Sequence, residues 1–359
     1  MLSQYSCPSL AQSENMKSIS LGVLAGGVLL SIILKKHREI SFRNRVALVT
    51  GGSRGLGLIL AEKLAAQGAQ VAICARDAQE LLKVEQLFIA KGLRVSTFKC
   101  DVTREDEVKQ LMSDCIQKLG RLDILVNNAG IIQVGPAEAM DLGDYHEAMN
   151  VNFWGTVHCS LSALPFLLQP NSGRRSGRIV NITSIGGTVA VPHLLPYSAS
   201  KFACVGFSEA FGIEVAKLGV RVTTVVPGLM RTGSFLNALF KGNRENEFKW
   251  FALASSMPGL SIDAEKAASQ ILEACQRGDS FLTISYPAKI ARLANACFPQ
   301  IARSLASTIN RLLPSPRAGY GESSVQVSKP GYLYRTKLSS PPVTWLGDLA
   351  AVKFNEKVA

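Results

Sequence analysis

A glycine-rich octapeptide, Thr50-Gly51-Gly52-Ser53-Arg54-Gly55-Leu56-Gly57, joins a short apolar run to a longer stretch of helical character. The apolar run is Val46–Thr50, and the helical stretch is Gly55–Gln67. Glycines 51, 55 and 57 permit a tight turn, close approach of the backbone to a pyrophosphate, and close packing of the helix on the strand. The N-terminus of that helix adds free N–H groups and a positive dipole, which attract phosphate. The octapeptide therefore predicts a dinucleotide-binding turn between a strand and a helix.

The alternation of apolar run and amphipathic stretch continues as far as residue 285. The further runs are β-branched and nearly continuous: Val71–Ala75, Val95–Lys99, Ile124–Asn127, Ile179–Ile182, Val222–Val226 and Phe281–Ser285. Strands of a parallel sheet that is buried on both faces have this character. Helical stretches lie between them, as at Ala78–Lys91 and Arg104–Leu119. The repeated βα units predict an α/β fold, a Rossmann-like doubly wound parallel sheet of about seven strands flanked by helices.

The composition suits one large domain with extensions at both ends. Of 359 residues, 47% are apolar and 18% charged, which excludes wholesale disorder and collagen-like, mucin-like or disulfide-framework classes. The formal net charge is +12, so we expect an anionic partner: a phosphorylated cofactor, a membrane surface or nucleic acid. Nucleic acid is the least favoured, because no binding module and few aromatic residues accompany the basic C-terminal part. The eight cysteines form no CxxC pair and the histidines number four, so we expect a reducing compartment and no metal site.

An uncharged apolar segment precedes the domain. Residues 1–17 are polar, residues 18–34 carry no charge, and Lys35, Lys36, His37 and Arg38 follow at once. As a helix, this segment would span roughly 25 Å, just short of a hydrocarbon core. Positive charge on its C-terminal side disfavours a cleavable signal peptide. We expect a single-pass transmembrane anchor over 18–34 with the catalytic domain on the cytoplasmic side of a membrane; the alternatives are a buried helix or an organelle-targeting segment.

A basic extension follows the last predicted strand. Residues 287–313 predict one or two helices, because Phe298, Ile301, Leu305 and Ile309 recur at spacings of three and four with basic residues on other faces. Such a helix lies on a membrane surface or packs on the domain, and the sequence favours neither. Residues 314–359 are rich in Pro, Gly and Ser, so we expect a flexible tail there.

The end of the second predicted strand bears on the choice of cofactor. An acidic residue there usually binds the ribose 2′-hydroxyl of NAD, but this chain reads Cys74-Ala75-Arg76-Asp77, with Ala75 at the acidic position. Arg76, together with Arg54 in the glycine turn, suits a 2′-phosphate. The sequence therefore favours NADP(H) over NAD(H). Asp77 leaves an alternative open, because it could cap the next helix or reach the ribose.

A tyrosine and a lysine one helical turn apart are the candidate catalytic pair. In Tyr197-Ser-Ala-Ser-Lys201 the two side chains share a helix face, so the ammonium can approach the phenol. A free tyrosine has a pKa of about 10, and a nearby cation is expected to lower it. Tyr197 could then protonate a carbonyl oxygen or deprotonate an alcohol. Ser184, at the end of the fifth strand, would hydrogen-bond the same oxygen.

These motifs, in order, resemble those of the short-chain dehydrogenase/reductase family. The resemblance covers about residues 44–286 and rests on the glycine turn, Cys100-Asp101-Val102, Asn127-Asn128-Ala129-Gly130, Val151-Asn152, Ser184, Tyr197-xxx-Lys201, and Pro227-Gly228 with Thr232. It implies a catalytic tetrad of Asn152, Ser184, Tyr197 and Lys201, in which Asn152 holds a water that links Lys201 to solvent. It also implies a homo-oligomer.

The resemblance assigns the cofactor contacts as well. Asp101 would contact the adenine, Asn128 to Gly130 would line the adenosine, and Lys201 would bind the nicotinamide ribose. Pro227, Gly228 and Thr232 would hold the carboxamide and phosphates. The full set of predicted cofactor contacts is Gly51, Ser53, Arg54, Gly55, Leu56, Gly57, Arg76, Asp101, Val102, Asn128, Ala129, Gly130, Tyr197, Lys201, Pro227, Gly228 and Thr232.

The sequence therefore predicts an NADP(H)-dependent reductase acting on a small-molecule carbonyl, or on the matching alcohol. Residues 229–260 contain several aromatic residues, which either cover an apolar substrate or pack against the domain. Two other functions stay open: an NAD-linked alcohol dehydrogenase, and a non-catalytic membrane-anchored nucleotide-binding scaffold. The intact Ser184, Tyr197 and Lys201 argue against the scaffold.

Overall fold

A computed structural model describes residues 39–169, 177–315, 328–337 and 344–356 of the chain. The elements discussed below all belong to one compact unit, which spans Ser41–Ala359. The predicted anchor at residues 18–34 lies outside the described residues. Within the described ranges, none of the helices has the length and apolar character needed to cross a bilayer.

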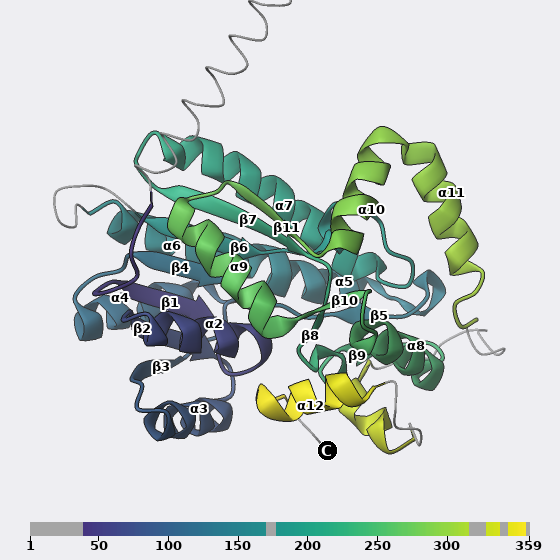
Figure 1. The fold of residues 1–359 in the computed structure, drawn as a ribbon, viewed down its shortest axis with the longest axis horizontal. Helices are drawn as coiled ribbons and strands as arrows, with labels where there is room; N and C mark the ends of the chain where they lie inside the picture. The colour runs from purple at the N-terminus through teal and green to yellow at the C-terminus, as the bar shows by residue number, and fades with distance from the viewer. Residues whose placement is uncertain (1–38, 170–176, 316–327, 338–343, 357–359) are drawn as a thin grey trace, which may run out of the picture. The chain divides into compact units, whose positions relative to one another are not determined.

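Seven parallel strands form the central sheet, in the order β11-β7-β6-β4-β1-β2-β3 (Figure 1). They are β1 (Val46–Thr50), β2 (Gln70–Ala75), β3 (Val95–Lys99), β4 (Ile124–Asn127), β6 (Arg178–Ile182), β7 (Arg221–Pro227) and β11 (Phe281–Ile284). The chain winds outward in one direction from β1 and in the other from β4. A crevice therefore opens at the carboxyl ends of β1 and β4, where ligands bind in folds of this type. The predicted doubly wound sheet is confirmed.

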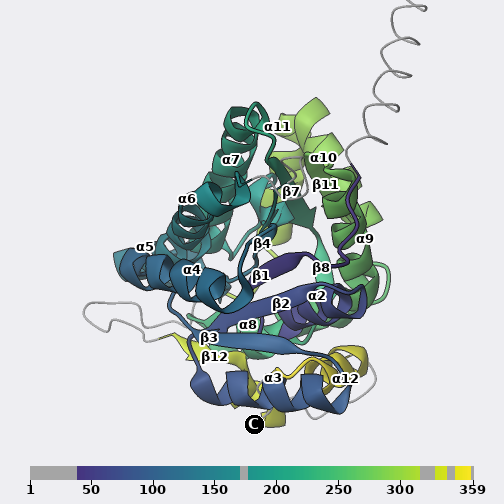
Figure 2. The same ribbon diagram turned by 90° about the vertical axis from the view of Figure 1, so that its left-hand side faces the viewer.

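Helices cover both faces of the sheet (Figure 2). On one side lie α2 (Gly55–Ala66) and α9 (Ala264–Arg277); on the other lie α4 (Glu105–Leu119), α6 (Gly155–Leu167) and α7 (Leu195–Ala216). Both faces of the central strands are consequently shielded from solvent, and Leu48 of β1 and Ile73 of β2 are fully buried. This burial explains why the strands read as continuous apolar runs.

The remaining elements that precede the basic extension lie outside the central sheet and its five main covering helices. They are α3 (Ala78–Ala90), β5 (Gln133–Val134), η1 (Ala137–Ala139), α5 (Leu142–Ala148), η2 (Met149–Trp154), η3 (Ile185–Gly187), β8 (Leu229–Arg231), η4 (Ser234–Leu236), β9 (Leu239–Phe240), α8 (Arg244–Ser256) and β10 (Ser261–Asp263). The predicted basic extension is two helices, α10 (Tyr286–Cys297) and α11 (Pro299–Asn310). After α11 come β12 (Lys329–Pro330), η5 (Gly331–Lys337) and α12 (Trp345–Lys353).

The expectation of a flexible tail over 314–359 is wrong for residues 328–337 and 344–356. Strand β12 pairs with β9, and α12 packs on the segment that follows β7. The contact depends on small residues, because a side chain at Gly233 would lie 2.5 Å from Ala351, and one at Gly347 would lie 2.8 Å from the Phe235 ring. Backbone approach at glycine therefore replaces the large apolar residues whose scarcity suggested disorder.

Candidate active site

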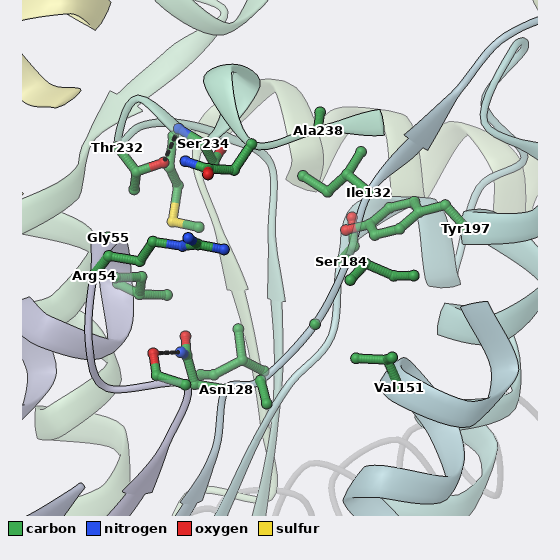
Figure 3. Close-up of a pocket in the computed structure, with 18 of the residues that line it drawn as sticks. Arg54, Gly55, Asn128, Ile132, Val151, Ser184, Tyr197, Thr232, Ser234 and Ala238 are labelled. Atoms are coloured by element: carbon green, nitrogen blue, oxygen red, sulfur yellow. Dashed lines mark hydrogen bonds between the residues drawn. The ribbon is translucent and has the colours of Figure 1, made fainter. Parts of the chain in front are cut away.

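A cavity of about 930 Å³ lies at the carboxyl ends of the central strands. It is lined at one end by the glycine turn and at the other by Ser184, Tyr197 and apolar side chains (Figure 3). The predicted site residues that line it are Gly51, Ser53, Arg54, Gly55, Leu56, Arg76, Asp101, Val102, Asn128, Ala129, Gly130, Ser184, Tyr197, Lys201, Pro227, Gly228 and Thr232. Gly57 and Asn152 lie behind this surface.

The glycine turn is built by backbone contacts. A Cβ at Gly57 would come within 2.2 Å of the Gly51 carbonyl oxygen, so only glycine lets α2 pack against the turn. Asn128 donates from Nδ2 to the carbonyls of Thr50 (3.1 Å) and Gly51 (3.0 Å). The Asn128 side chain therefore holds the turn in shape. Because α2 begins at Gly55 and both Gly55 and Leu56 line the cavity, the N-terminus of this helix borders the cavity, and the turn fits a dinucleotide diphosphate.

Helix α7 presents Tyr197 and Lys201 to the other end of the cavity. The Lys201 ammonium donates to the Ile182 carbonyl (3.0 Å) and lies 5.8 Å from the centre of the Tyr197 ring. Ser184 N-caps η3, where its Oγ accepts from the Gly186 N–H (3.1 Å). In Figure 3 the hydroxyl ends of Ser184 and Tyr197 lie next to each other at the wall of the cavity. The structure thus brings together three of the four predicted catalytic side chains.

The protonation of the pair differs from the sequence expectation. The pKa of Tyr197 is raised to about 12, mainly by burial; its hydrogen bond with Ser184 acts in the opposite direction. The ring keeps some surface because it lines the cavity, yet it lies deep within the domain, so desolvation still dominates. Burial also lowers the pKa of Lys201. In the chain alone, the ammonium does not lower the phenol pKa below its usual value, because it is directed at the Ile182 carbonyl and desolvation opposes the phenolate.

Asn152 occupies a π-helical turn, η2, and is fully buried. Its Oδ1 accepts from the Ile131 N–H (2.9 Å), and its Nδ2 donates to the Ile131 carbonyl (3.1 Å) and to Ser200 Oγ (2.9 Å). These bonds connect η2 with α7 and with the chain after β4. Such π-turns recur at functional sites. The water-holding role of Asn152 stays a prediction, and the observed bonds show that its side chain braces the lysine-bearing helix.

The predicted 2′-phosphate end contains a carboxylate that the sequence reading missed. Glu80, in the first turn of α3, accepts from Ser53 Oγ (2.7 Å) and from Arg54 Nη1 (2.9 Å). Arg76 is exposed and lines the cavity. Asp77 N-caps α3, accepting from the N–H groups of Gln79 and Glu80, which is the capping alternative for this residue. The acidic first turn of α3 was the only signal for Glu80 in the sequence.

A second unpredicted carboxylate comes from the C-terminal segment after α12. The Phe354 carbonyl accepts from the Gly55 N–H (2.8 Å), and Asn355 Nδ2 donates to the Ser53 carbonyl (2.9 Å). Glu356 follows; it lines the cavity, is buried, and lies 3.6 Å from Arg54 Nε. Burial raises the pKa of Glu356 to about 7, and Arg54 acts against that rise. About 300 residues separate Glu356 from the turn, so no sequence pattern pointed to it.

The remaining predicted contacts lie along the same wall. Asp101 Oδ1 accepts from the Thr103 N–H (3.0 Å), the Gly228 N–H donates to the Ile284 carbonyl (3.1 Å), and Thr232 Oγ1 accepts from the Ser234 N–H (3.2 Å). These bonds fix the loops after β3 and β7 at the edge of the cavity.

The far end of the cavity is apolar. Among the aromatic residues of the predicted substrate-covering segment, Trp250 and Phe251 line it. Phe235, Phe240 and Phe248 instead pack in a buried cluster with Tyr332 and Tyr334 of the C-terminal extension. Phe251 also belongs to this cluster and Trp250 packs against it, so these two residues both line the cavity and join the core of the domain. Trp250 is oriented by its Nε1–H, which donates to the buried Glu247 (2.6 Å).

The fold and the cavity define a dinucleotide-dependent oxidoreductase of the Rossmann type. A model of the short chain dehydrogenase family matches residues 45–239, more than half of the chain. The chain therefore belongs to the short-chain dehydrogenase/reductase family, whose members bind a nicotinamide cofactor, and it is an oxidoreductase of that type.

Individual relatives agree with this family. The chain is 31% identical over 295 residues to the fatty acyl-CoA reductase of Acinetobacter baylyi, covering 80% of this chain and 93% of the relative. It is 36% identical over 189 residues to the 3-oxoacyl-acyl-carrier-protein reductase of a Synechocystis species, covering 52% of this chain and 75% of the relative. The solved structure of a short-chain dehydrogenase from Streptomyces avermitilis superposes with a TM-score of 0.64 at 28% identity, over 75% of this chain and 98% of that one.

Proposed function

We propose that the protein reduces the carbonyl group of a lipophilic small molecule with NADPH, with Tyr197 as general acid. The observation that carries this proposal is the position of the Tyr197 and Ser184 hydroxyls, where the dinucleotide half of one cavity meets its apolar half. The catalytic and cofactor-binding roles of the other predicted residues form part of the proposal.

A bound reduced nicotinamide supplies hydride in this chemistry. The chain's own residues deal with the oxygen that receives it. Ser184 Oγ and the Tyr197 hydroxyl converge on one point, at which they would hold a carbonyl oxygen. Tyr197 then donates its proton to that oxygen. A phenol with a pKa raised to about 12 carries its proton at neutral pH, as a general acid must.

Lys201 and Asn152 support the tyrosine indirectly. The Lys201 ammonium is buried against the Ile182 carbonyl, one helical turn from Tyr197, where it stabilises negative charge that develops on the phenol. A methyl on Gly130 would lie 2.9 Å from Asn152 Oδ1 and 3.5 Å from Lys201 Nζ. Asn152 and Lys201 thus lie close around one glycine, and a change at either would disturb the other.

The preference for NADP(H) rests on Arg54 in the turn and Arg76 after β2, which both line the cavity. Glu80 favours the second candidate, an NAD-linked enzyme, because its carboxylate takes the Ser53 and Arg54 donors that a 2′-phosphate would use. We favour NADP(H), because an exposed arginine such as Arg76 suits a 2′-phosphate and is not needed to bind a 2′-hydroxyl.

Replacing Arg76 with glutamate should weaken NADPH binding about fivefold, because an exposed guanidinium contributes only a screened contact with a phosphate. NADH binding should be unchanged. Titrations with each dinucleotide, followed by the quenching of protein fluorescence, measure the affinities for NADPH and NADH. Arg277→Glu, at the C-terminal end of α9 and outside the cavity lining, is the control. Equal losses for the two dinucleotides would refute the assignment of Arg76 to the 2′-phosphate.

The proposed substrate is apolar because Trp250, Phe251 and Leu194 line the far end of the cavity. Two relatives carry names that indicate acyl substrates, a fatty acyl-CoA reductase and a 3-oxoacyl-acyl-carrier-protein reductase. The test follows NADPH absorbance with the purified protein against ketones and aldehydes graded in chain length. We expect turnover to rise with chain length. No turnover with any carbonyl, but NAD reduction by alcohols, would support the second candidate instead.

Two further properties belong to the proposal. We expect a homo-oligomer through the outer faces of α6 and α7, where Leu161, Phe202 and Ile213 are exposed. We also retain residues 18–34 as a membrane anchor that leaves the catalytic domain on the cytoplasmic side.

A further inference from the structure

Helices α10 and α11, with the turn that follows, form a hairpin (Tyr286–Leu312) that carries an uncovered apolar face. Of the 22 large apolar side chains exposed among the described residues, eight belong to this hairpin: Tyr286, Ile290, Leu293, Phe298, Ile301, Leu305, Ile309 and Leu312. Helix α11 buries none of its residues and lies at the outer edge of the molecule (Figure 1). A patch of this extent on a folded domain marks an interaction surface.

The inner side of α10 fixes the direction in which the apolar face points. Ala288 is buried against Gly228, Asn295 Nδ2 donates to the Thr188 carbonyl (3.1 Å), and Arg292 stacks 4.1 Å from the centre of the Phe281 ring. Tyr286, Ile290 and Leu293 lie on the opposite side, at spacings of three and four residues. The hairpin is therefore attached to the domain by its polar and small residues, and its large apolar side chains are left outside.

The charge of the hairpin indicates what covers this face. Between Tyr286 and Leu312 the chain contains no Asp or Glu, but it contains Lys289, Arg292, Arg303 and Arg311. An amphipathic helix with Lys and Arg on its polar face and large apolar residues on the other lies in the interface of an anionic bilayer. We propose that the Tyr286–Leu312 hairpin docks on an anionic lipid surface, with its apolar face in the acyl boundary.

The position of the hairpin gives this docking a consequence for substrate access, which rests on the proposed function. Thr188, to which Asn295 is bonded, follows Ser184 by four residues, and Gly228, against which Ala288 packs, lines the cavity. The base of the hairpin thus adjoins the cavity at Gly228. Docking of the hairpin would therefore place the cavity close to the lipid surface that holds an apolar substrate.

Cys297 provides a reporter that separates this contact from any other membrane attachment of the chain. It lies on the apolar side of α10, eleven positions after Tyr286 and four after Leu293, and it is exposed. The other described cysteines are buried. In the full chain with Cys7→Ser, a nitroxide on Cys297 is measured with vesicles that contain phosphatidylglycerol. We expect collisions with oxygen to increase and collisions with a polar nickel chelate to decrease. A label on the polar face of α11, in Cys297→Ser with Ser307→Cys, should stay accessible to the chelate.

Two sets of variants test the physical basis. Ile301→Glu with Leu305→Glu should return the Cys297 label to the aqueous phase without loss of fold, because α11 buries none of its residues. Arg303→Gln and Arg311→Gln should each reduce the preference for anionic over zwitterionic vesicles about fivefold. Circular dichroism and dinucleotide binding serve as controls for folding.

Two results would overturn the proposal. One is a Cys297 label that stays equally accessible to the chelate with and without vesicles, whether or not the chain itself sediments with them. The other is shielding that is already present without vesicles and increases with protein concentration, since that would identify a second copy of the chain as the occupant. Neither result bears on carbonyl reduction, so the docking proposal can fail while the proposed function stands.

Discussion

Replacing Tyr197 with phenylalanine is expected to lower kcat for carbonyl reduction by about 10²- to 10⁴-fold, the usual contribution of a positioned general acid. The change removes one hydroxyl and leaves the ring that lines the cavity. Dinucleotide affinity should fall far less than kcat, because the ring stays in place and the removed hydroxyl bonds to Ser184. Steady-state rates and a fluorescence titration of NADPH measure the two quantities separately.

The matched control is Tyr286→Phe, which removes the same atom from an exposed ring on α10. It should leave both quantities unchanged. Full turnover by the purified Tyr197→Phe protein would contradict the general-acid role, and equal loss of turnover and binding would show that the hydroxyl is structural.

Burial sets the pKa of the Tyr197 phenol. The sequence predicts that the Lys201 ammonium lowers the phenol pKa, but in the folded chain burial raises that pKa to about 12. Each unit of that shift corresponds to about 1.4 kcal/mol against the phenolate. Tyr197 therefore stays protonated until negative charge develops on the substrate oxygen. The measured pH profile of kcat for reduction should consequently be flat through neutral pH.

Local sequence specified the central sheet almost completely. The seven predicted strands match β1, β2, β3, β4, β6, β7 and β11 to within one residue at each end. Burial on both faces is the reason, because it demands continuous apolar runs that nothing else in this chain resembles. The glycine turn was predictable for a similar reason, since the close approach at Gly57 excludes every side chain.

Contacts between distant segments were beyond the reach of such patterns. Glu80 and Glu356 both meet the turn through tertiary packing, and a lone acidic residue in a helix or tail carries no signal of its partner. The composition of the tail predicts flexibility, yet glycines at 233, 331 and 347 let its backbone pack tightly. The sequence could not show that small residues in one segment matched small residues in another.

Glu356 gives the prediction that a sequence reading could not have made. The Glu356→Gln variant is expected to bind NADPH about tenfold more tightly than the unaltered protein at pH 8.5, because removing about 1.4 kcal/mol of repulsion corresponds to a factor of ten. At pH 6 the two proteins should bind NADPH equally tightly. The carboxyl group is buried, lines the dinucleotide end of the cavity and has a pKa raised to about 7. Below pH 7 it is protonated and neutral. Above pH 7 it ionises and repels the phosphates of the dinucleotide.

Ionisation of Glu356 also lowers the stability of the fold, because the folded chain holds this proton more tightly than the unfolded chain does. The folded pKa of about 7 exceeds the ordinary value of 4.5, so stability is highest below pH 4.5 as far as this group is concerned and declines as the pH rises to 7. The variant should therefore also melt at a higher temperature than the unaltered protein at pH 8.5. Phe354 and Asn355, which hold the segment on the turn through Gly55 and Ser53, stay in place in the variant.

Isothermal titration with NADPH from pH 6 to 8.5 measures the effect, and the ratio of the two proteins at each pH cancels the titration of the dinucleotide itself. Glu273→Gln, an exposed carboxyl group on α9, is the matched control and should give a ratio near one throughout. A constant ratio for Glu356→Gln across this pH range would show that the buried carboxyl group does not titrate against the dinucleotide. Weaker binding by the variant at every pH would show instead that Glu356 supports the turn through Arg54, and that its charge assists binding rather than opposing it.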